Sequence, residues 1–514
     1  MLKKFVLFLI SLLVFNPVYS KNISGEWHND LKSVFLKNSA IIYTINIRTF
    51  NAKDKNGNEL IDDNEEGGNF INAIEELDNL SKLGINTVHL LPITPVGKIK
   101  AFGTAGSLYA MSSFNEINPQ LVSKSLSASG VEQAKRFVKE CHKRNIRVII
   151  DLPSCGAYDL FIAHPEYFMK DENGSPIIPL DWTDVRLFSE GSSKDVNGDL
   201  LKLHKGFVDM IISIGADGIR ADVARLKSKW FWTELIKYTR EKDKEFLFLA
   251  EASLLWNEPV SKYSLNTSVE ELFDAGFDGY LGSYMNFKNI EYAKDFISYV
   301  QNDLKMFSKY KSQKSVVGSF TSHDEVSPIL IHGQNFSKMI IWLNSTLPMN
   351  SYYVDGFPSG DTYNYQWANK YATESQTDDE YYFTHNGQLD IFNFSRKPGG
   401  SDYSILNEFI LANKFKRYYS HDLSTAKFIP LKSSNPKVFA YARPLRGQTV
   451  VVFGNLDFKS GQESIIKISK FKPDKRIVNL RVQQALKNEY SNGKIKTTLD
   501  AGDIQVLLIK NMVL

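Results

Sequence analysis

Three acidic residues each follow a short apolar segment of the chain, and their types and positions suit catalysis. Asp222 and Glu251 end or directly follow such segments, and Asp324 comes next to His323 after a third. Arg220 stands two residues before Asp222, so both side chains point to the same side of a strand. A lone acid after a strand is as readily a helix N-cap as a functional group. Three acids on different strands, accompanied by an arginine and a histidine, favour a catalytic site.

The chemistry that suits this set is the cleavage of a glycosidic bond with retention of configuration. Such a reaction uses one ionised carboxylate as nucleophile and a second carboxyl group as acid and then base, about 5 Å apart. The Arg220 guanidinium is expected to lower the pKa of Asp222 and keep that nucleophile ionised. Glu251 is then the predicted acid/base. Asp324 is predicted to bind sugar hydroxyls and to favour the distorted, cationic transition state.

These residues need a scaffold that brings the ends of distant strands together, and the pattern of the chain predicts one. Short β-branched runs alternate with amphipathic stretches from about Ser39, which is typical of repeated βα units and a parallel sheet. The predicted strands are Ile41–Ile47, Thr87–Leu91, Arg147–Leu152, Gly218–Val223, Phe246–Ala250 and Val316–Phe320. Helices are predicted over 70–83 and 131–144. Units of this kind over roughly 350 residues predict an α/β fold of the (β/α)8 barrel type, with catalytic groups at the carboxyl ends of strands.

Two departures from the repeating pattern divide the chain further. Residues from about 153 to 200 are rich in Pro, Asp, Asn and Gly and too many for an ordinary βα loop, which predicts a short inserted loop domain after the third strand. Beyond about residue 405, short strands predict a C-terminal antiparallel β-sandwich domain over 406–514. The catalytic barrel is expected over 21–405, with its insert on the face of the active site.

The first twenty residues predict a signal peptide over 1–20. Lys3 and Lys4 precede an apolar run from Phe5 to Phe15, which is too short to cross a membrane. Cleavage would leave a secreted or periplasmic protein with no membrane contact. The alternative is an uncleaved N-terminal anchor.

The composition of the chain limits its partners. Of 514 residues, 43% are hydrophobic and 23% are charged, and 61 Lys and Arg balance 58 Asp and Glu. The apolar fraction supports large cores and excludes a disordered chain. The near balance of charge argues against binding nucleic acid and agrees with a neutral substrate. Two cysteines exclude a disulfide scaffold, no organic cofactor is expected, and the pattern predicts no particular oligomeric state.

The segments that carry the three acids resemble those of the alpha-amylase family, glycoside hydrolase family 13. The run Asp-Gly-Ile-Arg-Ala-Asp-Val-Ala at 217–224 is similar to the nucleophile strand of that family, and 249–252 to its acid/base strand. The run Phe-Thr-Ser-His-Asp at 320–324 resembles the strand with the transition-state-stabilising Asp. The resemblance implies that Asp222 is the nucleophile, Glu251 the acid/base and Asp324 the stabiliser. It also implies the (β/α)8 barrel and the C-terminal β-sandwich.

The resemblance further implies a set of substrate-binding residues. Tyr43 in the first predicted strand would stack on the scissile sugar, and His323 would be a sugar ligand. Asp151 matches the Asp at the end of the third strand of the family. Arg220 completes the set beside the nucleophile.

The chain departs from the family after the third strand. The family reads Asp-x-x-x-Asn-His there, whereas this chain has Cys155 in place of an Asn that helps bind calcium and Gly156 in place of a sugar-contacting His. The nucleophile region ends in Arg225-Leu226, where many amylases have Lys-His, so the contacts on the acceptor side are expected to differ. Cys155, with the run His-Pro-Glu at 164–166, resembles the maltosyltransferase branch, but export argues against the phosphorylated cytosolic donor of that branch.

A loop after the first predicted strand is a candidate calcium site. Its oxygen-bearing side chains stand at alternate positions, as in calcium loops, and it resembles a loop in oligosaccharide-cleaving members of the family. The implied ligands are Asp54, Asn56, Asn58, the carbonyl of Leu60, Asp62 and Glu66. An EF-hand match is imperfect because Gly57 stands at the fourth position and not at the sixth. A solvated turn rich in Asp and Asn is the alternative.

These features together predict a retaining glycoside hydrolase that cleaves α-glucosidic bonds in starch-like polymers or maltooligosaccharides. Two alternatives stay open. One is an α-glucanotransferase, in which a sugar acceptor outcompetes water. The other is a non-catalytic glucan-binding barrel, which the loss of the third-strand Asn and His favours and the presence of all three acids opposes.

Overall fold

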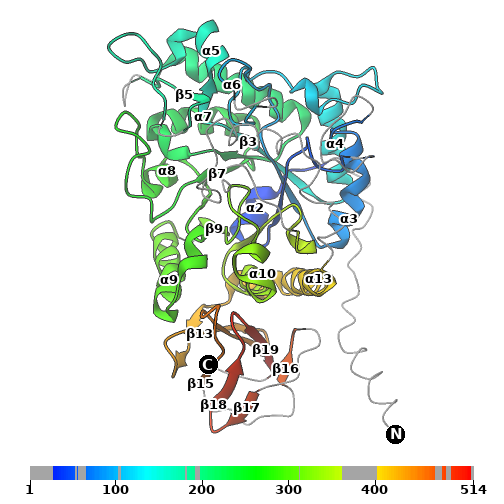
Figure 1. Ribbon diagram of the computed structural model, residues 1–514, viewed down its shortest axis with the longest axis vertical. Coiled ribbons are helices and arrows are strands. Elements are labelled where there is room, and N and C mark those ends of the chain that lie inside the picture. Colours follow the sequence, from blue (N-terminus) through cyan, green and yellow to red (C-terminus); the bar gives the residue numbers. More distant parts are fainter. Residues whose placement is uncertain are drawn as a thin grey trace.

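A closed barrel of parallel strands with its helices forms the larger part of the molecule, and a β domain packs against the helices on one side of it, at the bottom of Figure 1. The computed structural model describes residues 27–52, 55, 65–101, 106–179, 182–191, 197–311, 313–361, 402–468, 477–481 and 488–510. The predicted signal peptide, 1–20, lies outside these residues. The predicted fold class, a (β/α)8 barrel followed by antiparallel sheets, is confirmed.

The barrel closes by pairing its first strand with its last, in the order β1-β10-β9-β8-β7-β6-β3-β2. The strands are β1 (Ile41–Ile45), β2 (Thr87–Leu90), β3 (Arg147–Leu152), β6 (Gly218–Ala221), β7 (Leu247–Glu251), β8 (Gly279–Leu281), β9 (Ser315–Gly318) and β10 (Asn350–Val354). Every residue of these strands is buried, because side chains fill the barrel and helices cover it. This explains why the strands read as continuous apolar runs and not as alternating ones.

Helices surround the barrel and connect its strands. They are α2 (Leu31–Leu36), α3 (Leu77–Lys82), α4 (Gly130–Lys143), α6 (Gly198–Ile214), α7 (Lys229–Lys242), α8 (Val269–Ala275), α9 (Ala293–Lys309), α10 (Pro328–Thr346), α13 (Tyr403–Tyr418) and α14 (Ser420–Thr425). The helix predicted over 131–144 is α4, which begins with a capping box between Ser129 and Glu132. The helix predicted over 70–83 begins as a 3-10 turn, Asn72–Glu76, and continues as α3.

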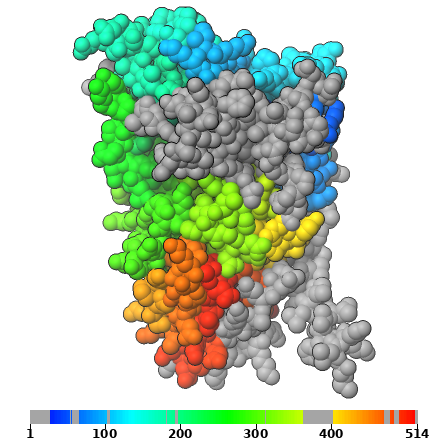
Figure 2. Space-filling view, viewed as in Figure 1, coloured from blue at the N-terminus to red at the C-terminus, as the bar shows by residue number. Residues whose placement is uncertain are grey.

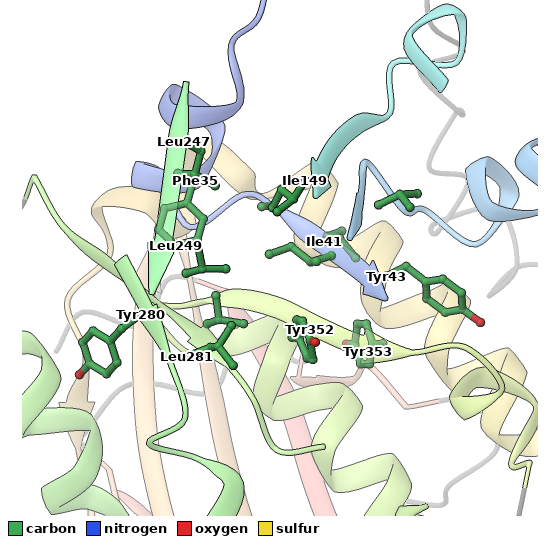
Figure 3. Packing of buried hydrophobic residues seen from close by; sticks show 14 of the residues in the cluster. Phe35, Ile41, Tyr43, Ile149, Leu247, Leu249, Tyr280, Leu281, Tyr352 and Tyr353 are labelled. Atoms are coloured by element: carbon green, nitrogen blue, oxygen red, sulfur yellow. The ribbon is translucent and has the colours of Figure 1, made fainter. Parts of the chain in front are cut away.

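The short helix α2 packs its buried side chains against the barrel. Figure 3 shows Phe35 beside Leu247 and Leu249 of β7. Gly279 of β8 leaves the room for this ring, since a Cβ there would lie 2.4 Å from Phe35. The segment before β1 is therefore part of the barrel core.

The predicted insert lies between β3 and α6. Within it β4 (Cys155–Ala157) pairs antiparallel with β5 (Val185–Leu187), and α5 (Tyr158–Ala163) follows β4. The insert has its own apolar cluster, which includes Cys155 and Leu187. A Cβ at Gly156 would lie 2.7 Å from the ring of Phe168, so this position does not accommodate the His that the family has there.

The β domain consists of two antiparallel sheets. One has the order β11-β13-β14-β19-β16 and the other β12-β15-β18-β17. Their bounds are β11 (Ile429–Pro430), β12 (Lys432–Ser433), β13 (Val438–Leu445), β14 (Gln448–Asn455), β15 (Gln462–Lys467), β16 (Ile477–Asn479), β17 (Asn488–Ser491), β18 (Lys494–Leu499) and β19 (Ile504–Lys510). Successive side chains of β14 face opposite ways: Val451 and Phe453 join the core between the sheets, and Val450 and Val452 join the barrel core.

The barrel and the β domain share a continuous core, with α10 and α13 between them (Figure 2). The expected boundary at 405/406 falls inside α13, and helices continue to Thr425 before the first strand of the β domain. Glu408 of α13 accepts from Trp342 Nε1 (2.7 Å) and Arg481 Nε (2.8 Å), which joins α10, α13 and the β domain. Among the described residues, no helix is long and apolar enough to cross a membrane.

Candidate active site

Arg220 is the centre of a cluster of carboxylates at the carboxyl end of the barrel. Its Nη1 lies 2.9 Å from Asp151 Oδ1 and 2.9 Å from Asp222 Oδ1, and its Nη2 lies 2.9 Å from Glu251 Oε2. The parallel register of the barrel explains the gathering, because Asp151 is opposite Arg220 and β7 is the next strand. One buried guanidinium thus orients three acids from three adjacent strands.

Asp324 joins this cluster from the turn after β9. Its carboxylate is close enough to Glu251 for that charge to raise its pKa, and its Oδ1 lies 3.4 Å from His323 Nε2. Its side chain is 32% exposed, against 15% for Asp222 and 11% for Glu251. The three predicted catalytic acids therefore meet at one end of the barrel and keep contact with solvent.

Tyr109 hydrogen-bonds to two of the predicted substrate-binding residues, although no pattern in the sequence indicated this role. Its hydroxyl lies 2.8 Å from Asp151 Oδ2 and 2.7 Å from His323 Nε2. The single hydroxyl proton goes to the carboxylate, so His323 donates from Nε2 to the tyrosine oxygen. The Tyr109 ring lies parallel to that of His323, with centroids 5.7 Å apart, and the Arg220 guanidinium is 5.9 Å from its centroid.

Tyr43 is placed differently from the expectation that it stacks on the sugar. Only 3% of Tyr43 is exposed. Its hydroxyl donates to Asp355 Oδ1 (2.7 Å) and accepts from the Gly356 backbone N–H (3.2 Å), which anchors the turn after β10. Figure 3 shows its ring at the carboxyl end of β1. Stacking of Tyr43 on a sugar stays a prediction, which its low exposure argues against; the ring of Tyr109 among the site residues is only partly buried.

The chain turns sharply after Asp222. Val223 has φ 34° and ψ 53°, a left-handed conformation that a β-branched residue rarely adopts. Its backbone N–H donates to Glu251 Oε2 at 2.7 Å. The strained turn thus links the predicted nucleophile to the predicted acid/base, and strain of this kind persists only where surrounding contacts enforce it.

Burial and neighbouring charges shift the pKa values of the carboxyl groups in the site. Burial raises and the Arg220 guanidinium lowers the pKa of Asp151, which is about 2. Burial raises the pKa of Asp222 well above its ordinary value, Arg220 opposes this, and Glu251, Asp151 and Asp324 reinforce it. Burial and Glu251 raise the pKa of Asp324 to about 8. The pKa of Asp222 is therefore raised, whereas the Arg220 guanidinium was expected to lower it. Burial and three neighbouring carboxylates outweigh one guanidinium.

The calcium loop predicted at 54–66 falls largely outside the described residues. This holds for Asp54, Asn56, Asn58, Leu60 and Asp62. Glu66 is described, and its Oε1 accepts from Ser123 Oγ at 2.9 Å. In the part of the chain that the structure describes, no group of three or more His, Cys, Asp or Glu side chains could hold a metal ion.

The corner after β3 does not fit the calcium that the family resemblance implies there. Burial raises the pKa of the Cys155 thiol to about 12, so Cys155 is a neutral sulfur ligand where calcium prefers oxygen. The neighbouring cation is the ammonium of Lys227, whose Nζ lies 2.8 Å from the Ser154 carbonyl oxygen. A positive side chain therefore already stands at this corner.

Comparisons with known proteins relate the chain to carbohydrate-active enzymes. A search of family models found no match. The chain is 26% identical over 237 residues to a cyclomaltodextrinase of Bacillus sp, which covers 40% of this chain and 39% of the relative. It is 22% identical over 431 residues to an alpha-1,4-glucan:maltose-1-phosphate maltosyltransferase of Corynebacterium glutamicum, which covers 78% of this chain and 57% of the relative. The chain is thus similar in sequence and fold to members of the alpha-amylase family.

Solved structures of that family share the fold. An alpha-amylase from Lactobacillus plantarum superposes with a TM-score of 0.66 and 20% identity, over 92% of this chain and 99% of that one. A maltogenic alpha-amylase from Thermotoga neapolitana gives a TM-score of 0.63 and 21% identity over the same shares. The sequence matches span 16% of a rice isoamylase, 39% of the cyclomaltodextrinase and 57% of the maltosyltransferase. The relatives are thus amylase-type hydrolases and transferases, and the chain matches only part of their length.

Proposed function

We propose that the protein is a retaining glycoside hydrolase that cleaves α-glucosidic bonds in starch-like polymers or maltooligosaccharides. The observation that carries the proposal is the position of Arg220, which contacts Asp222 and Glu251 through different nitrogens and orients them toward one centre. This reaction needs a nucleophilic carboxylate and an acid/base carboxyl group, and the barrel end holds such a pair with a third carboxyl group beside it. The relatives named as cyclomaltodextrinase and maltogenic amylase support the substrate class.

The reaction has two steps in this proposal. In the first, Asp222 Oδ forms a bond to the anomeric carbon while the glycosidic oxygen departs with a proton from Glu251. In the second, Glu251 takes a proton from water, the water oxygen attacks the anomeric carbon, and the bond to Asp222 breaks. Both steps pass through a cationic transition state beside Asp324, whose ionised form stabilises it. The sum is hydrolysis with retained configuration.

The bound sugar brings the site to its working protonation state. In the free protein, burial and the charges of neighbouring carboxylates raise the pKa of Asp222 and Asp324. A substrate that donates hydroxyl hydrogen bonds to these carboxylates favours their ionised forms, and the positive charge developing on the sugar favours them further. We therefore expect substrate binding to release protons at neutral pH.

An α-glucanotransferase is the second candidate. One match over 78% of this chain is to a maltosyltransferase. An aromatic face also lies next to the turn after Asp222: the Arg225 guanidinium is 5.2 Å from the centroid of the Trp256 ring, and Arg225 Nη1 donates to the Glu258 carbonyl at 2.8 Å. Such a face could hold an acceptor sugar in place of water. Chromatography of products distinguishes the two, because a transferase makes chains longer than its substrate.

The proposal is tested by assaying wild type and Asp222→Asn on soluble starch, maltodextrin and cyclomaltodextrin, with reducing-sugar release and product chromatography. Wild type is expected to produce shorter α-glucans and Asp222→Asn almost none. Asp295→Asn, an exposed acid in the first turn of α9, serves as the control and should keep full turnover. If wild type binds these glucans but turns over none of them, the non-catalytic barrel is the correct function.

We also propose that the loop 54–66 binds one calcium ion. The alternate oxygen ligands in the sequence support this, and Glu66 is the ligand that the structure describes. Titration calorimetry with calcium on wild type and on Asp62→Asn tests it. Wild type should bind one ion, and Asp62→Asn should bind it at least about tenfold more weakly because a carboxylate ligand is lost. Equal heats for both proteins would reject the site.

Export is proposed on the sequence of residues 1–20. Two lysines and an apolar run of about eleven residues support a cleaved signal. Mass spectrometry of the protein outside the cytoplasm should find an N-terminus near residue 21. An intact Met1 on protein that stays in the membrane fraction would instead support the uncleaved anchor.

A further inference from the structure

Lys227 is a buried lysine five residues after Asp222, the predicted nucleophile, and the reaction proposed above assigns it no role. Lys227 is only 1% exposed, and its Nζ lies 5.0 Å from the centroid of the Phe188 ring. Burial lowers its pKa, and the carboxylate of Glu190 opposes that shift. Keeping an ammonium group in apolar surroundings costs stability unless its hydrogen bonds and charge are used.

The ammonium of Lys227 connects to the backbone of Asp222 through one residue. Its Nζ donates to the Ser154 carbonyl at 2.8 Å, and the Ser154 hydroxyl donates to the carbonyl of Asp222. The backbone N–H of Asp222 in turn donates to the Leu152 carbonyl at 3.0 Å. Both backbone polar groups of Asp222 are therefore held, the N–H by the last residue of β3 and the carbonyl by Ser154 just after it.

The turn after Asp222 needs such support. Val223 is in the left-handed region, which is strained for a residue that is not glycine. One contact that holds it is the bond from its N–H to Glu251. Another is its packing against the apolar cluster of the insert, which includes Leu187 and Leu226. A relaxed turn would move the Asp222 carboxylate away from the position that Arg220 and Glu251 define.

The far end of the insert bonds the residue that follows Lys227. Glu190 is 7% exposed, and its Oε2 accepts from the Ser228 backbone N–H at 2.5 Å, one residue after Lys227. The charges of Lys227 and Glu190 stabilise each other, as their opposed effects on each pKa show. The start of the insert thus bonds Lys227 itself, at Ser154, and its far end bonds the next residue, Ser228, at Glu190.

We propose that Lys227 is a positioning residue, an internal cation that bonds the start of the insert at Ser154, attracts the Glu190 carboxylate at its far end, and thereby fixes Asp222 for attack. The proposal rests on the function proposed above, since it assumes that Asp222 reacts. Ser154 transmits the effect through its hydroxyl. Lys227 takes the place of a bound metal ion at a corner whose residues do not suit calcium.

Two substitutions test the connection at its two ends. Lys227→Met removes the ammonium and keeps the length of the side chain, and Ser154→Ala removes only the bond to the Asp222 carbonyl. Both are expected to lower kcat on maltodextrin by about 10- to 100-fold with KM within about twofold, because a nucleophile displaced by a fraction of an ångström still binds substrate. Ser154→Thr keeps the hydroxyl and should restore most of kcat.

Lys416 provides a matched control on α13. It is also a buried lysine, 2% exposed, and its Nζ donates to two backbone carbonyls, those of Asn344 (2.8 Å) and Met349 (2.7 Å). Lys416→Met should lower the melting temperature about as much as Lys227→Met but leave the kcat of the folded protein unchanged. This separates positioning of Asp222 from a general loss of stability.

The outcomes distinguish this inference from the proposed function. If wild type has no turnover, the proposed function fails and the inference fails with it. If wild type is active and Ser154→Ala and Lys227→Met keep its kcat, the inference alone is wrong. Should Lys227→Met not fold, the comparison of Ser154→Ala with Ser154→Thr decides: equal kcat values for these two would overturn the proposal, and a loss restored by Thr would support it.

Discussion

The two ends of strand β6 carry aspartates five positions apart, and their surroundings are opposite. Asp217, before the strand, is 1% exposed and accepts from Trp27 Nε1 (2.8 Å), from His142 Nε2 (2.9 Å) and from the Val148 backbone N–H (2.7 Å). Asp222, after the strand, shares one arginine with two other acids and keeps 15% of its side chain exposed. The Asp217 carboxylate accepts three hydrogen bonds, whereas the Asp222 carboxylate lies close to two other carboxylates.

This difference separates stability from function along a single strand. Donors from three parts of the chain bond the carboxylate of Asp217 and join the segment before α2 to the barrel. At the other end, burial and repulsion raise the pKa of Asp222 and Asp324, which is unfavourable for folding and useful for chemistry. We therefore expect substitutions at the two ends to affect different measurements.

The largest expected effects come from the pair Asp222→Asn and Asp217→Asn. Asp222→Asn should lower kcat by about 10³-fold or more, since the nucleophile is lost, and should leave the melting temperature unchanged or higher. Asp217→Asn should lower the free energy of unfolding by about 1–3 kcal/mol, because it leaves buried donors poorly paired, and should keep the kcat of the folded protein. Kinetics and thermal denaturation of both variants check this. A loss of kcat in folded Asp217→Asn would contradict the separation.

A smaller effect is expected at the two tyrosines, Tyr109 and Tyr43. Tyr109→Phe removes the hydroxyl between Asp151 and His323 and should lower kcat/KM by about 10- to 100-fold, the range for one lost contact to a charged group. Tyr43→Phe removes the bond to Asp355 and should chiefly lower stability, by about 1 kcal/mol. Michaelis–Menten kinetics and denaturation of both variants are the measurements. The reverse pattern would return the sugar-contacting role to Tyr43.

The smallest effect is a pH dependence of stability that Asp324 contributes, since its side chain is 32% exposed and solvent screens its charge. Its pKa is about 8 in the folded protein, above its ordinary value of 3.8, so the unfolded chain loses this proton first as pH rises. Wild type should therefore lose stability between about pH 4 and pH 8, where the unfolded state is ionised and the folded state is not. Asp324→Asn has no such proton, so its melting temperature should exceed that of wild type by more at pH 8 than at pH 5. The exposed control Asp295→Asn should show no such trend.

Much of the barrel could be predicted from the sequence, and the exceptions have physical causes. The six predicted strands all belong to the barrel, because buried parallel strands read as apolar β-branched runs. β8 is only three residues long and gives too short a run. β10 begins with Asn350, whose side chain bonds the backbone of Ala40 and Phe35, so a buried polar network replaces the apolar signal there.

The sequence indicated those site residues that lie at the ends of predicted strands. It did not indicate site residues in the connections between them. Asp222, Glu251 and Asp151 end or follow strands, and the barrel brings them to one arginine as the spacing predicts. Tyr109 lies in the long connection between β2 and α4, where no periodic pattern marks it, and reaches Asp151 only through the fold. Lys227 was also missed, because a lysine after a strand is ordinarily a solvated residue and only its burial reveals a role.

The most direct test of the central claim is to identify the residue that becomes bonded to the sugar. Wild type is incubated with an activated 5-fluoro-α-glucosyl or maltosyl fluoride, which forms the glycosyl-enzyme faster than water removes it, and is then digested for peptide mass spectrometry. The account predicts one added sugar on the peptide that contains Asp222, and none in Asp222→Asn. A label on Glu251 or Asp324, or hydrolysis of natural substrate with inverted configuration and no label, would contradict it.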